Sequence, residues 1–137
     1  MKKIFLNSII VSFILAAMLL SNINITFAAS YSVSVSSKSV KSGEKITVSI
    51  SGDGCEGSFK VSVNNGASVT GYNTIWTGES TTVVAGSNNF TITISPQSVT
   101  SSTDGSKIEN FKSKSFNISI KTTIKLATNQ KSQVTTL

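Results

Sequence analysis

Histidine and arginine are both absent from this sequence of 137 residues. The lack of histidine excludes Ser-His-Asp and Cys-His catalytic arrangements and most zinc sites. Arginine is the side chain that most often contacts base edges and stacks on bases, so its absence argues against nucleic acid as a partner. The twelve basic residues are all lysines, and beyond the first three residues they are scattered singly. We therefore expect neither a conventional hydrolase nor a nucleic-acid-binding protein.

Cysteine occurs once, at Cys55, so no disulfide bond can form within the chain. A bridge to another chain is one interpretation, but we expect Cys55 to be a small residue in a turn. Charged residues are only 13% of the chain. The carboxylates all fall in expected turns or loops, with neither the paired placement of a glycosidase site nor a calcium-loop spacing: Glu44, Asp53, Glu56, Glu79, Asp104 and Glu109. We predict no catalytic residue, no metal site and no cofactor.

Residues 1–29 have the pattern of a secretory signal peptide. Two lysines at the start precede an apolar run from Ile4 to Leu20, and small residues follow before the first strand-like pattern. The alternative is an uncleaved membrane anchor, but polar residues interrupt that stretch. We therefore predict a secreted or extracellular cell-surface protein, with contact to the membrane only if the segment is retained. Removing the two lysines leaves ten lysines against six acids, a net charge of +4.

Cleavage is expected at or next to Ala28 and Ala29, because small residues at the end of an apolar run suit signal peptidase. N-terminal sequencing of the exported protein would test this directly. Exported chains that still begin with Met1 would identify the segment as a membrane anchor.

The rest of the chain is dominated by alternation of apolar and hydroxyl residues. The clearest case is Asn88 to Ser95, a period-two pattern typical of a half-buried strand. Similar stretches recur between turn signals, which include the Gly-rich segment Ser51 to Gly57, the hairpin signal Asn64 to Gly66 and the strand-ending Pro96. About seven short strands without a helix indicate an all-β sandwich or barrel.

The shared parity of these strands predicts which side chains form the core. The expected buried residues are Val48, Ile50, Phe59, Val61, Phe90, Ile92, Ile94, Phe116 and Ile118. The expected outward residues are Thr47, Ser49, Lys60, Thr91, Thr93 and Asn117.

Three stretches resemble bacterial immunoglobulin-like domains on Gram-positive (Firmicutes-type) surfaces. They are YSVSVSSKSVKSGEKITVSISG, SFKVSVNNGASVTGYNTIWTGES and TITISPQSVTSSTDGSKI, which share a pattern of alternating strands and glycine turns. The first stretch is also distantly similar to cohesin domains, although the insertion-rich middle of cohesins is missing here. The resemblance implies an Ig-like antiparallel β-sandwich over residues 30–126, followed by a flexible tail at 127–137.

Two groups of residues are candidates for binding. One is the long polar loop expected from Pro96 to Asn110, whose chemically varied side chains are Gln97, Asp104, Lys107 and Glu109. The other consists of aromatic residues, because Tyr31, Tyr72 and Trp76 could together stack on a sugar. The competing interpretation, which we favour, places Trp76 in the core, as in many sandwiches.

These observations predict a non-catalytic extracellular Ig-like module that serves in interaction, adhesion or spacing. The alternative is a small carbohydrate-binding module that recognises a sugar or a cell-wall polymer. The partner is then an unidentified protein or glycan.

Overall fold

The structure, a computed structural model, describes residues 12–13 and 28–122. Nearly all of the expected signal peptide and the whole of the expected tail lie outside the described residues. The strands are β1 (Ser30–Val35), β2 (Ser39–Val40), β3 (Lys45–Asp53), β4 (Cys55–Val63), β5 (Ser68–Thr70), β6 (Thr74–Trp76), β7 (Ser80–Val84), β8 (Phe90–Ser101) and β9 (Lys114–Ile120).

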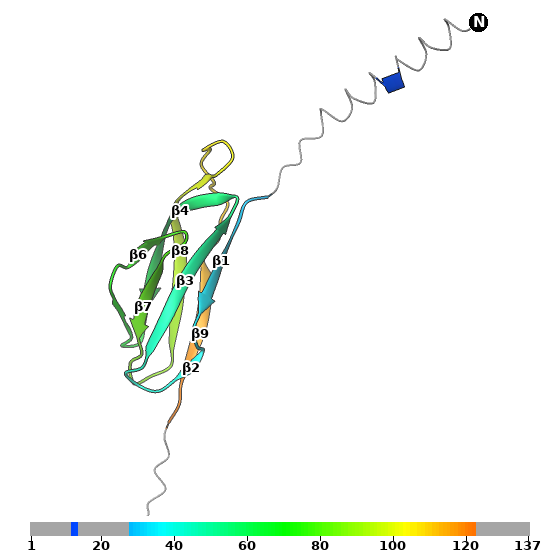
Figure 1. Ribbon diagram of the computed structural model, residues 1–137. Helices are drawn as coiled ribbons and strands as arrows, with labels where there is room; N and C mark the ends of the chain where they lie inside the picture. Colours follow the sequence, from blue (N-terminus) through cyan, green and yellow to red (C-terminus); the bar gives the residue numbers. More distant parts are fainter. Residues whose placement is uncertain (1–11, 14–27, 123–137) are drawn as a thin grey trace, which may run out of the picture.

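These strands form two sheets packed face to face, an all-β sandwich (Figure 1). One sheet has the order β1-β3-β7-β5, and the other has the order β2-β9-β8-β4-β6. Without β2 and β6, these are the A-B-E-D and G-F-C strand orders of an immunoglobulin-type sandwich. The expected sandwich of about seven strands is therefore confirmed, with two short strands added.

The sandwich is not wholly antiparallel, because β2 runs parallel to β9. The chain leaves the first sheet after Val35 and joins the second at Ser39. Ser37 supports this crossing, because its hydroxyl accepts from the Ser39 amide at 3.2 Å and donates to the Ser39 carbonyl at 2.9 Å. A polar serine run between two strands thus lets one stretch of chain contribute to both sheets.

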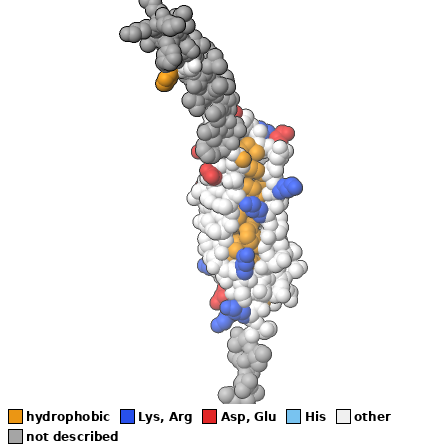
Figure 2. Space-filling view, turned by 90° about the vertical axis from the view of Figure 1, so that its right-hand side faces the viewer, with side chains coloured by type: hydrophobic (Ala, Val, Ile, Leu, Met, Phe, Trp, Pro, Cys, Tyr) orange, Lys and Arg blue, Asp and Glu red, His pale blue; other side chains and the backbone are white. Residues whose placement is uncertain are grey.

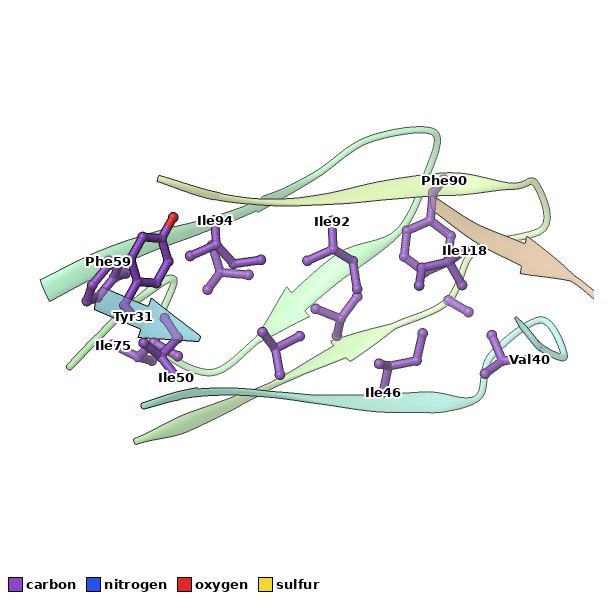
Figure 3. Packing of buried hydrophobic residues seen from close by; sticks show 14 of the residues in the cluster. Tyr31, Val40, Ile46, Ile50, Phe59, Ile75, Phe90, Ile92, Ile94 and Ile118 are labelled. Atoms are coloured by element: carbon purple, nitrogen blue, oxygen red, sulfur yellow. The ribbon is translucent and has the colours of Figure 1, made fainter. Parts of the chain in front are cut away.

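The core lies between the sheets, and it contains most of the side chains that strand parity predicts. Eight of the nine expected core residues are buried, and Ile92, Ile94 and Phe59 have no exposed surface. Figure 3 shows Ile50 of β3 facing Phe59 and Ile94 of the opposite sheet, and Ile46 of β3 facing Phe90 and Ile118.

Phe116 is the exception, since it is only partly buried against the core. It has the same parity as Ile118, but it lies on β9 where that strand is the edge of its sheet. Of the expected outward residues, Thr47, Lys60 and Asn117 are exposed. Ser49, Thr91 and Thr93 are half-buried. For the two threonines the reason is that their hydroxyl groups bond across the sheet to side chains of β9, Asn117 and Ser115 respectively.

Two of the expected turns differ from the structure. The Gly-rich segment Ser51 to Gly57 is almost entirely strand, with only Gly54, at φ +67°, between β3 and β4. Cys55 is accordingly not in a turn but buried at the start of β4, where its thiol donates to the Ser30 carbonyl at 3.2 Å. Burial raises the pKa of this thiol. Two acidic residues expected in the turn are also in strands: Asp53 is the last residue of β3, and Glu56 lies in β4.

The Asn64 to Gly66 segment does turn, with Asn65 at φ 51° and Gly66 at φ 83°. It does not make a hairpin, because β4 and β5 belong to different sheets. The asparagines bond to β8 and the residue before it instead. Asn64 Oδ1 accepts from the Thr91 amide at 2.7 Å, and Asn65 Nδ2 donates to the Asn89 carbonyl at 3.0 Å. The segment predicted to form a hairpin therefore connects the two sheets instead.

Candidate functional site

Two large aromatic side chains are exposed at one edge of the five-stranded sheet. Trp76 of β6 is 56% exposed, and Tyr72, just before β6, is 85% exposed. Strand β6 is the last strand of its sheet and pairs with β4, where Trp76 lies opposite Ser58. We call Tyr72 and Trp76 the aromatic edge. Because large apolar surface is normally buried, such exposure on a folded scaffold marks a candidate contact surface.

The burial expected for Trp76 is wrong. Ile75 takes the inward position of β6 and is buried, so alternation directs Thr74 and Trp76 outward. Two apolar residues are adjacent here, and a shift of one residue exchanges which of them faces the core. The sequence alone therefore left this choice open, and pairing of Phe59 with Ile75 across β4 and β6 decides it.

Tyr31 does not belong with the other two aromatic residues. It is buried, with its ring centroid 4.7 Å from that of Phe59 and 5.2 Å from that of Phe111. Its hydroxyl donates to the Lys112 carbonyl, and burial raises the pKa of this phenol. Among the described residues, no ring contact joins Tyr72 to Trp76, so the platform reduces to two separate exposed rings.

Hydrogen bonds hold the backbone of the aromatic edge in place. The Trp76 amide donates to Glu79 Oε2 at 2.9 Å, and the Glu79 amide returns a bond to the Trp76 carbonyl at 3.0 Å. The Thr81 hydroxyl donates to the Tyr72 carbonyl at 2.9 Å. A side chain presented from a fixed backbone loses less freedom on binding, which favours affinity. The role of Glu79 was not evident from the sequence, where it was one of several acids in turns.

On the outer face of the sheet, residues with hydroxyl side chains lie in line with Trp76. Ser58 lies between Trp76 and Ser98 in the pairing of β6, β4 and β8, and it is only 8% exposed. Lys60 lies two residues further along β4, between Thr74 and Ser95. Because Ser58 is buried, the exposed polar groups of this face are those of Ser98, whose hydroxyl can donate and accept hydrogen bonds, and of Lys60, whose ammonium group can donate them.

The long loop begins later than the sequence predicts. Pro96 does not end its strand, because β8 continues to Ser101. Proline is tolerated here because the pairing shifts at this point: Phe59 lies opposite Pro96, whereas Ser58 lies opposite Ser98. Gln97 is the extra residue of this bulge, so it is part of a strand and not of a loop.

A small hairpin occupies the start of the remaining loop. The Ser101 amide donates to the Ser106 carbonyl at 2.8 Å, and the Gly105 amide donates to the Ser101 carbonyl at 2.9 Å. Asp104 accepts from the Ser106 amide at 3.0 Å and from its hydroxyl at 2.7 Å. These bonds to Ser106 hold the pKa of the exposed Asp104 carboxyl below its usual value. The loop is therefore ordered by local bonds.

The structure brings together three of the four polar residues predicted in this loop. Gln97, Lys107 and Glu109 line one shallow hollow of about 190 Å³, together with apolar residues that include Ile108. Lys107 and Glu109 form an ion pair at 3.1 Å, with both side chains largely exposed. Such an exposed pair contributes little to stability. Asp104 lies outside this hollow, at the hairpin.

The described part of the chain contains no group of three His, Cys, Asp or Glu side chains that could hold a metal ion. Within that same part, no helix is long and apolar enough to cross a membrane.

The chain was compared with known proteins in three ways. No family model, no curated protein and no solved structure matches this chain. The resemblance to Gram-positive surface domains thus remains a prediction from the sequence patterns.

Proposed function

We propose that this protein is a non-catalytic, extracellular Ig-like interaction module of a bacterial secreted or cell-surface protein, and that it binds through the aromatic edge. The observation that carries this proposal is the 56% exposure of Trp76 on a hydrogen-bonded edge strand. Tryptophan and tyrosine are the side chains most enriched at binding hot spots. In a protein without a partner at this surface, exposing such large apolar side chains to water would be unfavourable.

A carbohydrate or cell-wall polymer is the second candidate ligand. It is favoured by the position of Trp76 on an outer face that also carries the exposed hydroxyl group of Ser98, in line with Trp76 across β4. Aromatic rings stack on the apolar faces of sugars, and neighbouring hydroxyl groups bond to their edges. In this case the module retains its sandwich and its exported location, and its partner is a glycan and not a protein.

Trp76→Ala should weaken binding of the ligand recovered in a pull-down with cell-wall and glycan fractions. The expected loss is about 2 kcal/mol or more, the range of a binding hot spot. Because Trp76 is more than half exposed, the variant should unfold at nearly the same denaturant concentration as the original protein. Affinity would be measured by titration calorimetry. Unfolding would be measured by the circular dichroism of the backbone, which does not rely on the fluorescence of Trp76.

A shortened loop provides the matched comparison. Replacing residues 102–105 by a two-residue Gly-Ser link removes the hairpin tip and should leave affinity unchanged, since loop length affects folding weakly. If Trp76→Ala binds normally and the shortened protein does not, the aromatic edge is not the contact surface and the hairpin is. If no fraction binds to the original protein, a spacer role replaces the interaction role.

A further inference from the structure

The sandwich is open along the side opposite the aromatic edge, between β1 and β9. These strands are edge strands of different sheets over most of their length, and β2 covers only the Ser119–Ile120 end of β9. Val33 and Val35 of β1 and Phe116 of β9 face this opening and are only partly buried. Figure 2 shows a continuous stripe of hydrophobic side chains along this side, with lysines over it. We call the opening between β1 and β9 the seam.

The backbone of β9 offers unpaired groups at the seam. The Ser119 amide donates to the Lys38 carbonyl at 2.9 Å, so amides of this parity point away from β8. By strand alternation, the amides of Ser115 and Asn117 point to the same side. There β2 is absent, and among residues 28–122 no other strand takes its place. This is an open strand edge of the kind to which another extended segment can pair.

Lysines give the seam its charge. Lys114 pairs with Ile94 and therefore lies on the core side of β9, where its ammonium group donates to the Tyr31 carbonyl and lies 4.3 Å from the Tyr31 ring centroid. Lys38 lies with its ammonium group 5.6 Å from the Phe116 ring centroid. No acidic residue occurs in β1, β2 or β9. The positive charge over this apolar stripe is therefore not neutralised by any residue of the three strands that border it.

The charge decides between the occupants that such an edge could accept. A second copy of this chain, paired seam to seam, would bring its own lysines against Lys38 and Lys114, and like charges across an interface are unfavourable. A simple polyanion would satisfy the lysines but would leave the apolar stripe and the open amides unused. An extended peptide with apolar and acidic side chains satisfies all three features at once.

We propose that the seam is a second binding site, which receives an extended segment of a partner protein as an added strand on the open edge of β9. Apolar side chains of the segment contact Val33, Val35 and Phe116, and a carboxylate of the segment pairs with Lys114. Backbone bonds to Ser115 and Asn117 set its register. The site is independent of the aromatic edge, since β6 lies at the other end of the same sheet (Figure 1).

The test uses two short capped peptides that differ in one charge. Acetyl-Thr-Val-Thr-Glu-Thr-Val-Thr-amide places Val, Glu and Val on one face of a strand, and its twin carries Lys in place of Glu. The Glu peptide should bind about tenfold more tightly than the Lys peptide, as expected for one partly desolvated charge pair. In NMR titrations, the amide signals of Ser115 and Asn117 should move, while that of Trp76 should not.

Protein variants test separately the contribution of the Lys114 charge and that of the open backbone edge of β9. Lys114→Gln should remove the preference between the two peptides, and Lys114→Glu should reverse it. Ser115→Pro removes an amide that points away from β8, so the sheet should tolerate it while peptide binding is lost. Thr74→Pro is the matched control, because it places proline on the opposite edge strand of the same sheet and should leave binding unchanged. Circular dichroism verifies that each variant is folded.

Three results would overturn the proposal. One is equal or undetectable binding of the two peptides to the original protein. Another is undiminished binding of the Glu peptide to folded Ser115→Pro. The third is binding of polyphosphate in the absence of any binding of the Glu peptide, which would mean that the lysines serve a polyanion and that no strand is added.

Discussion

Ile92→Ala should lower the free energy of unfolding by about 2–5 kcal/mol, the range for removing a large aliphatic side chain from a core. Ile92 has no exposed surface and lies near the start of β8, paired with Val63 of β4 on one side and with Phe116 of β9 on the other. Few atoms near it can move to fill the space, because two paired strands hold it on either side. Chemical denaturation of the two proteins measures the difference directly.

The neighbouring residue provides the control for this prediction. Thr93 points to the outer face, where its hydroxyl lies 3.2 Å from that of Ser115. Thr93→Ala should therefore change the free energy of unfolding by well under about 1 kcal/mol, as is usual for surface substitutions. Equal losses from Ile92→Ala and Thr93→Ala would mean that the register of β8 is wrong.

Gly57→Ala should destabilise the protein by about 3 kcal/mol or more, at the upper end of the range for overpacking. Gly57 lies in β4 opposite Val99, next to the bulge of β8. A methyl group added at Gly57 would lie 2.2 Å from the Ser98 carbonyl oxygen and 2.6 Å from the Val99 Cα. Both atoms belong to the backbone, so the two strands would have to separate. Thermal and chemical denaturation would measure the loss.

A different glycine distinguishes this clash from ordinary backbone strain. Gly105 in the hairpin has φ +71°, but no atom lies within 4 Å of an added methyl group. Gly105→Ala should cost about 1–2 kcal/mol, the penalty for an L-residue in the left-handed region. If Gly57→Ala were no worse than Gly105→Ala, the close approach of β4 and β8 would not be a feature of the folded protein.

Prediction from sequence succeeded where one strand alone contains the needed information. The alternation of Phe90, Ile92 and Ile94 with hydroxyl residues determines which face of β8 is apolar, and that face is buried. The turn expected at Asn64 to Gly66 is also present, with Gly66 at φ 83°. These features follow from the period of a strand and from the conformational freedom of glycine, and both are local.

The candidate sites were harder to predict, because each depends on neighbours that are distant in the sequence. Trp76 is exposed because Ile75 pairs with Phe59, and nothing in the segment TIW itself favours that choice. Gln97 is in a bulge because β4 pairs with β8 in two registers. Glu79 holds the backbone of Trp76 through a turn whose geometry the sequence does not specify.

By itself, the sequence determined that the chain is all-β, that its strands have one apolar face, and which side chains could form a core. Tertiary structure decided which strand edges remain open. Phe116 and Ile118 have the same parity and similar apolar character, but only Ile118 is fully buried. The physical reason is that Phe116 lies where β9 has a neighbouring strand on one side only, whereas Ile118 lies next to the end of β9 that β2 covers, and this arrangement is a property of the assembled sheets.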